Sequence, residues 1–291
     1  MTAIAPTLEA APARRVKIPL AVILLIPITL INLIGFVAPV INLLSFSFRE
    51  VQATGAMTGG SSIASWVAIV TDPFYIELLV NSILTSLLIV VLTLVCSFPI
   101  ALLLHRTTGF ARTVLLFVVI TPLLTSAVVR TYGWIALLLD GGVINSLLSL
   151  AGLPTLKLIF NSTGVVIGLT EILMPYMILS LLAGFRRLDP RVEEAALTLG
   201  ANPFQTFWRI IVPLTLPGVA LGSLLCFVLA VSSFITPKLL GGGRVFLLAT
   251  EIYDQAMVTL NWPLASTLAI MILIVFGGAL FLYLRALRAI A

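Results

Sequence analysis

Polar and aromatic side chains within or beside long apolar segments are the residues of this chain that could do chemistry. The candidates are Glu77, Asn81, Arg130, Tyr132, Trp134, Glu171, Phe234 and Asp254. A carboxylate in such surroundings could bind an ammonium group, and aromatic rings attract cations. The same residues also have structural interpretations. Arg130 could form an ion pair with Glu171 or Glu77, and Tyr132 and Trp134 could be belt residues at a membrane interface.

The sequence contains no catalytic constellation. His105 is the only histidine, and Cys96 and Cys226 lie in separate apolar runs, which is typical of small buried side chains. The glycines at 241–243 are not followed by Lys-Ser/Thr, so they predict a turn and not a phosphate-binding loop. We therefore expect no enzymatic activity, no ATPase site, and no metal or cofactor bound by this chain.

Composition places the chain in the membrane. Its 291 residues are 60% hydrophobic and 9% charged, with a mean hydropathy of +1.22. Soluble domains carry about 25% charged residues, so this composition cannot build a water-facing surface. The net charge of +5 is explained by the charge bias that orients membrane helices, and not by a nucleic-acid partner. The sequence predicts an all-α integral membrane protein.

Six apolar segments are long enough to cross the hydrocarbon core, which takes about 20 residues. The predicted spans are 19–46, 75–103, 113–138, 161–185, 214–237 and 262–284. The first apolar run is far longer than the core of a cleavable signal peptide, so we expect an uncleaved helix. Between the first two spans we expect an outer loop with a short interfacial helix around 63–69.

Charges predict that both termini face the cytoplasm. Of the 16 Lys and Arg residues, 11 lie in the termini and in the loops 104–112 and 186–212, namely Arg14, Arg15, Lys17, Arg106, Arg112, Arg186, Arg187, Arg191, Arg209, Arg285 and Arg288. Seven of the 11 acids lie on the opposite side or in the outer parts of helices, namely Glu50, Asp72, Glu77, Asp140, Glu171, Glu251 and Asp254. A cationic solute is one explanation for this acidic excess.

The loop 186–213 contains two helix starts. Asp189 before Pro190 is typical of an N-cap followed by the first helical position, and Asn202 before Pro203 repeats the pattern. Gly200 between them predicts the end of the first helix. We expect two short helices joined at Gly200, with Pro213 ending the second before the next span.

The second short helix carries apolar side chains that we expect another surface to shield from water. Phe204, Phe207 and Trp208 are too apolar for a free loop, and the small Ala195 and Ala196 would let another backbone approach closely. From the residues alone, either a docked partner protein or the lipid headgroups could shield these side chains from water.

Glu194-Ala195-Ala196, with Gly200 four residues on and then Ile210 and Pro213, closely resembles the Glu-Ala-Ala loop of binding-protein-dependent ABC importer permeases of type I. Val212 stands where that pattern usually has Leu, a conservative change. Five further segments are similar to the spermidine/putrescine branch: 130–134, 142–145, 234–237, 240–242 and 261–263.

The resemblance implies partners and roles. It implies a second homologous permease, two ATPase subunits that bind ATP and Mg²⁺, a periplasmic solute-binding protein, and a place in the bacterial inner membrane. The ATPase-coupling residues would be Glu193, Glu194, Ala195, Ala196, Gly200, Pro203 and Phe204. The solute would be a polyamine, with aminophosphonates, ferric iron, opines and amino acids as alternatives.

Domain boundaries follow from these expectations. We predict a cytoplasmic tail at 1–17, a first transmembrane helix at 18–48, a periplasmic loop at 49–74, a permease core at 75–285 and a cytoplasmic tail at 286–291.

Two other classes of membrane protein compete with the importer permease. An ion-gradient-driven transporter could use Glu77, Glu171 and Arg130 as coupling charges, whereas a membrane enzyme or redox anchor would need the His ligands or cofactor motif that the sequence lacks.

Overall fold

The computed structural model describes residues 20–51, 57–186 and 188–290 of the chain. The chain separates into two units, Met1–Leu43 and Leu44–Ala291. Helix α1 (Leu20–Ser47) makes up the described part of the first unit and ends in the second. Its apolar side chains between Leu25 and Leu43 are largely exposed, which suits a helix surrounded by lipid or by another subunit.

The second unit opens with a small hairpin and a short helix. Strands β1 (Arg49–Val51) and β2 (Met57–Ser61) pair antiparallel. Helix α2 (Ala64–Thr71) follows, as predicted for the segment around 63–69. The hairpin was not predicted, because its Gly-rich second strand is typical of a loop.

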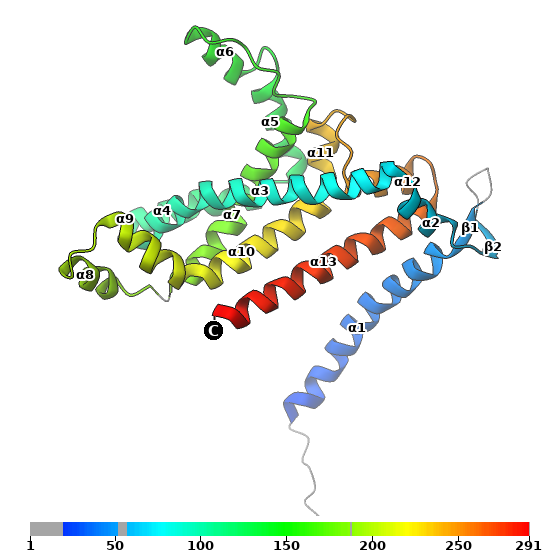
Figure 1. The fold of residues 1–291 in the computed structure, drawn as a ribbon, viewed down its shortest axis with the longest axis horizontal. Helices are drawn as coiled ribbons and strands as arrows, with labels where there is room; N and C mark the ends of the chain where they lie inside the picture. The colour runs from blue at the N-terminus through cyan, green and yellow to red at the C-terminus, as the bar shows by residue number, and fades with distance from the viewer. Residues whose placement is uncertain (1–19, 52–56, 187, 291) are drawn as a thin grey trace, which may run out of the picture. The chain divides into compact units, whose positions relative to one another are not determined.

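Three long helices form the core of the second unit (Figure 1). They are α3 (Pro73–Arg106), α7 (Ser162–Phe185) and α10 (Val212–Ser232), and α7 is the most buried of the candidate spans. Asp72 caps α3 and Asn161 caps α7 by accepting hydrogen bonds from backbone N–H groups. Helix α7 meets α10 where Gly184 faces Gly218, at a distance that leaves no room for a Cβ atom on either residue.

A second core lies beside the first. Helices α12 (Leu248–Met257) and α13 (Trp262–Ile290) pack on each other, and α13 also packs on α10. The Ser82 hydroxyl accepts a hydrogen bond from the N–H of Leu248, 2.8 Å away, which joins α3 to the start of α12.

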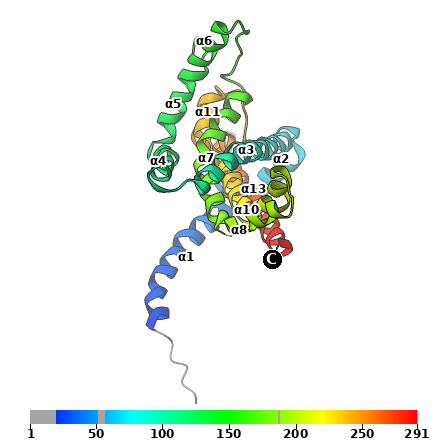
Figure 2. The same cartoon turned by 90° about the vertical axis from the view of Figure 1, so that its left-hand side faces the viewer.

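The third predicted span, 113–138, is wrong as a single helix. Helix α4 (Gly109–Ile120) leads into a 3₁₀ turn η1 (Thr121–Leu124), and α5 (Ala127–Leu138) starts anew at the Ser126 cap. Pro122 lacks the N–H that a continuing α-helix needs, which explains the tightened turn. After α5 comes α6 (Val143–Leu150), and both views show α5 and α6 leading away from the core (Figures 1 and 2).

The fifth predicted span, 214–237, is also wrong at both ends. Helices α8 (Pro190–Thr198) and α9 (Pro203–Thr206) confirm the two helix starts in the loop. Pro213 does not end a helix, because a π-helical turn η2 (Phe207–Ile211) carries α9 directly into α10. That helix ends at Ser232, and a separate helix α11 (Ile235–Leu240) follows.

The number of spans is as predicted. Within the described ranges, six segments are long and apolar enough to cross a membrane. The third of these is Ala127–Leu150, preceded by the shorter apolar segment Gly109–Leu124, and the fifth is Pro203–Ser232.

Candidate functional site

The α8–α9 loop takes its shape from local hydrogen bonds. The Asp189 carboxylate accepts from the Arg191 N–H at 3.0 Å and starts α8. Gly200 has φ +83°, a left-handed conformation that glycine adopts without strain. Asn202 and Gln205 then form a reciprocal capping box, with distances of 2.8 and 3.2 Å, that starts α9. The bend between the two helices is thus specified by the sequence itself.

Apolar side chains protrude from this loop. Leu199 is 88% exposed, Phe204 72% and Trp208 55%. Phe207 instead turns inward, with its ring centroid 5.4 Å from that of Phe98 on α3. An exposed apolar group of this kind marks a binding surface for another protein or for a membrane.

The residues of the Glu-Ala-Ala segment divide between the two faces of α8. Ala196 is 7% exposed and packs within the chain, whereas Glu194 and Ala195 are exposed. Glu193 forms an ion pair with Arg106 at the end of α3, with 2.6 Å between Nη2 and Oε2. Because this ion pair links α8 to a spanning helix, α8 is attached to the membrane bundle at its side as well as at its ends.

Glu77 and Asn81 line a polar cavity of about 420 Å³ near the start of α3, together with Thr85. These three residues are spaced four apart, so they form one stripe on the helix. Ser162 and Arg244 close the cavity from the start of α7 and the segment before α12. The cavity therefore combines one carboxylate with several uncharged hydrogen-bonding groups and one guanidinium.

Glu171 is bound by Trp134. The indole N–H of Trp134 on α5 donates a hydrogen bond to the Glu171 carboxylate on α7 at 3.0 Å. The expected ion pair of Arg130 with Glu171 or Glu77 is therefore wrong: none of the ion pairs between described residues involves Arg130. Tyr132, two residues from Trp134, is 57% exposed and lies outside this contact.

Arg130 lines a different cavity. Its volume is about 280 Å³, and α5, α7, α10 and the start of α11 surround it. The Nε and Nη1 atoms of Arg130 are buried without a hydrogen-bond partner in the part of the chain that the structure describes. Tyr176, Ser232 and Phe234 are among the other lining residues, so Phe234 shares this cavity with Arg130.

A cluster at the end of α10 contains two residues that sequence reasoning missed, Lys238 on α11 and Tyr253 on α12. Lys238 forms an ion pair with Asp254, and its ammonium nitrogen lies over the Tyr253 ring, 5.6 Å from the centroid. The Tyr253 ring also stacks on Phe234, with 5.2 Å between centroids and 14° between planes. Asp254 is therefore paired with a cationic side chain of the chain itself. In the sequence, the i to i+4 spacing of Phe234 and Lys238 could have indicated that these two side chains lie close together.

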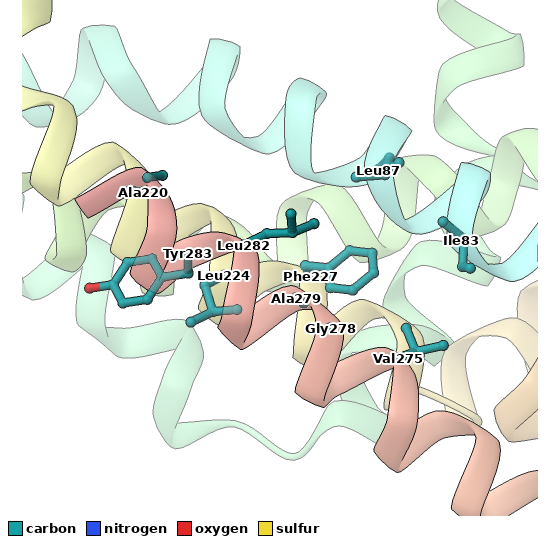
Figure 3. Close-up of a pocket in the computed structure, with 11 residues that line it drawn as sticks. Ile83, Leu87, Ala220, Leu224, Phe227, Val275, Gly278, Ala279, Leu282 and Tyr283 are labelled. Carbon is teal, nitrogen blue, oxygen red and sulfur yellow. The ribbon is translucent and has the colours of Figure 1, made fainter. Parts of the chain in front are cut away.

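A wide groove between α3, α10 and α13 is apolar, and its lining among the described residues includes no charged side chain (Figure 3). It holds about 550 Å³. The figure shows Ile83 and Leu87 from α3, Phe227 from α10 and Val275 from α13 around it. Such a surface fits hydrocarbon, either lipid chains or another apolar helix, and not a hydrophilic solute.

Comparisons with known proteins agree on one family. Residues 97–289 match the family described as "Binding-protein-dependent transport system inner membrane component". The chain is 34% identical to the spermidine/putrescine transport system permease protein PotB of Haemophilus influenzae, over 74% of this chain and 76% of that protein. It is 36% identical to PotB of Escherichia coli, over 75% of this chain and 80% of that protein.

Solved structures show the same fold. The chain aligns with a bacterial alginate ABC transporter in complex with an alginate-bound periplasmic protein, with a TM-score of 0.70 and 20% identity, covering 93% of this chain and 94% of that one. It also aligns with the MetNI methionine ABC transporter in an inward-facing conformation, with a TM-score of 0.55 and 16% identity, covering 72% and 93%. From its family match, its relatives and the six candidate spans among its described residues, the chain belongs to the binding-protein-dependent transport system inner membrane components and is a multi-pass protein of the inner membrane.

Proposed function

We propose that this chain is the permease subunit of an ATP-driven ABC importer that moves a polyamine such as spermidine or putrescine. The protruding α8–α9 loop carries this proposal, because its exposed Leu199 and Phe204 form an apolar surface that a docked ATPase subunit would cover. The identity to PotB proteins, named as spermidine/putrescine permeases, supports the substrate class.

The proposed assembly contains a second homologous permease, two ATPase subunits and a periplasmic binding protein. ATP and Mg²⁺ bind on the ATPase subunits, and this chain contributes no ATPase site and no cofactor of its own. It forms half of the pathway, and both of its termini lie in the cytoplasm. The similar solved structures are ABC transporters, one of them in complex with a periplasmic protein, and this supports such partners.

The loop couples ATP hydrolysis to transport in this proposal. Glu193, Glu194, Ala195, Ala196, Gly200, Pro203 and Phe204 contact the ATPase or shape the surface that does. When the ATPase subunits close on ATP, they displace α8 and α9. The displacement reaches the pathway by two connections, the Arg106–Glu193 ion pair to α3 and the unbroken helix from Pro203 to Ser232.

The pathway residues would be Glu77, Asn81, Arg130, Tyr132, Trp134, Glu171, Phe234 and Asp254. Glu77 in its polar cavity and Glu171 beside the Trp134 ring offer carboxylates to a cationic solute. Arg130 disfavours a bare cation at its own cavity, so it would limit where a polyamine can rest. The same machinery could instead carry an aminophosphonate, ferric iron, an opine or an amino acid.

Purification and reconstitution test the proposal. A tagged chain isolated from its native membrane should bring the ATPase and the second permease with it. In liposomes, this complex should take up radiolabelled spermidine only with ATP and the binding protein. Uptake driven by an ion gradient without any ATPase would favour the secondary-transporter alternative and contradict the proposal.

The contribution of the loop is tested by a matched pair of variants. Phe204→Ser should lose the ATPase during purification while keeping the second permease, because it removes an exposed apolar anchor. Phe110→Ser is the control, since Phe110 is 84% exposed at the start of α4, outside the loop. Loss of the ATPase from both variants, or from neither, would contradict a docking role for Phe204.

A further inference from the structure

The cluster of Lys238, Asp254, Tyr253 and Phe234 has the form of an occupied cation site. An aromatic ring lies beneath the Lys238 ammonium, a carboxylate pairs with it, and a second ring stacks on the first. Carboxylates and aromatic faces are the groups that recognise alkylammonium ligands. The occupant here is a side chain of the protein itself.

The chemistry of that occupant matches the proposed cargo. A lysine side chain is a four-carbon chain that ends in an ammonium group, and putrescine and spermidine contain the same aminobutyl fragment. A site shaped for Lys238 therefore has the size and charge for one end of a polyamine. We propose that this cluster is an alkylammonium site of the pathway, which Lys238 fills when no cargo is present and which a cargo ammonium enters by displacing Lys238.

Displacement is energetically accessible. The side chains of Lys238 and Asp254 are partly exposed, at 37% and 29%, so their ion pair is more easily opened than a fully buried one. One ring of the site, Phe234, also borders the Arg130 cavity of about 280 Å³. Lys238 lies on α11, a helix of six residues that is separated from α10 by the extended Ser233.

A side chain such as Lys238 that competes with the cargo for its site would suit a permease. Cargo must bind along a pathway strongly enough to enter and weakly enough to leave. Lys238 lowers the apparent affinity of the site by occupying it, and it returns to Asp254 when the cargo moves on. The site therefore never presents an unpaired carboxylate that would retain a polycation. This inference rests on the proposed polyamine function for its cargo, but the site itself is a claim about alkylammonium binding.

Direct binding tests the site in the purified complex, reconstituted in nanodiscs without ATP or binding protein. The probe is radiolabelled putrescine with n-butylammonium as competitor. Lys238→Met keeps the apolar stem and removes the ammonium, so both amines should bind about tenfold more tightly than to the wild type. Adding Asp254→Asn should abolish the gain. Lys157→Met, which removes an exposed lysine between α6 and α7, should bind like the wild type.

A chemical switch repeats the test on protein that is already folded. In a Cys96→Ala background, Lys238→Cys should bind both amines tightly. Labelling with 2-aminoethyl methanethiosulfonate restores an ammonium and should weaken binding again, whereas methyl methanethiosulfonate adds no charge and should not. Unchanged affinity in Lys238→Met, a gain that survives Asp254→Asn, or equal effects of the two reagents would overturn the site. If n-butylammonium binding responds as expected but spermidine uptake fails, the polyamine function is wrong and the site stands.

Discussion

At the scale of single residues, sequence identified the charged candidates but not their partners. Arg130 and Trp134 are four residues apart on α5 and share a face of that helix. Which of them reaches Glu171 depends on how α5 crosses α7, and no local pattern encodes that crossing. The indole N–H of Trp134 makes the contact, while two buried nitrogens of Arg130 have no partner among the described residues.

Trp134→Phe should destabilise the protein because it removes the donor that binds the Glu171 carboxylate. A hydrogen bond to a charged group contributes about 1.5–3 kcal/mol. Trp66→Phe is the matched control, since its indole donates to the neutral Ser47 hydroxyl at 3.3 Å, worth about 0.5–1.5 kcal/mol. Thermal unfolding in detergent should show the larger loss for Trp134→Phe, and a double variant with Glu171→Gln should lose less than the sum. Equal losses for the two Trp variants would contradict this assignment.

At the scale of elements, local signals predicted helix starts better than helix ends. The Asp189 and Asn202 caps could be read from sequence because a cap depends on neighbouring residues alone. Pro213 predicted an end that does not exist, because the Val212 N–H bonds to the Phe207 carbonyl five residues back and the helix continues through a π turn. The break before Ser126 was hidden by the continuous apolar character of 113–138.

The α7–α10 crossing depends on two glycines. A Cβ atom on Gly218 would lie 2.8 Å from the Gly184 Cα, so Gly218→Val must push the helices apart. Overpacking of this kind costs about 1–3 kcal/mol. We expect a lower unfolding temperature and loss of the monodisperse peak in size-exclusion chromatography. Gly277→Val on α13 is the control, since a Cβ atom there would meet no atom of the described residues within 4 Å; an equal defect would mean that valine itself, and not the crossing, is responsible.

At the scale of the whole molecule, the number of spans followed from the length of the apolar runs alone. Six were predicted and six candidate spans occur in the described ranges. The positions of the polar side chains in the pathway could not be predicted from the length of the apolar runs. The Glu77 cavity needs α3, the start of α7 and the segment before α12 together, and these segments are far apart in sequence.

The orientation of the chain is a prediction that reporter fusions can test. Green fluorescent protein fused after Ala291 or within the loop at Gly109 should fluoresce, because both sites lie on the Lys- and Arg-rich side expected in the cytoplasm. Alkaline phosphatase should be active when fused at Gly242, on the opposite side. An active phosphatase after Ala291 would reverse the orientation.

The continuous helix from Pro203 to Ser232 has a mechanical consequence. Its 30 residues measure about 45 Å at about 1.5 Å per residue, which is long enough to reach from one membrane surface to the other. A displacement at Pro203 acts along this helix towards Ser232, where the extended Ser233 separates it from α11. A displacement of this helix would therefore be passed to α11 through Ser233 as well as to the packed helices α3, α7 and α13.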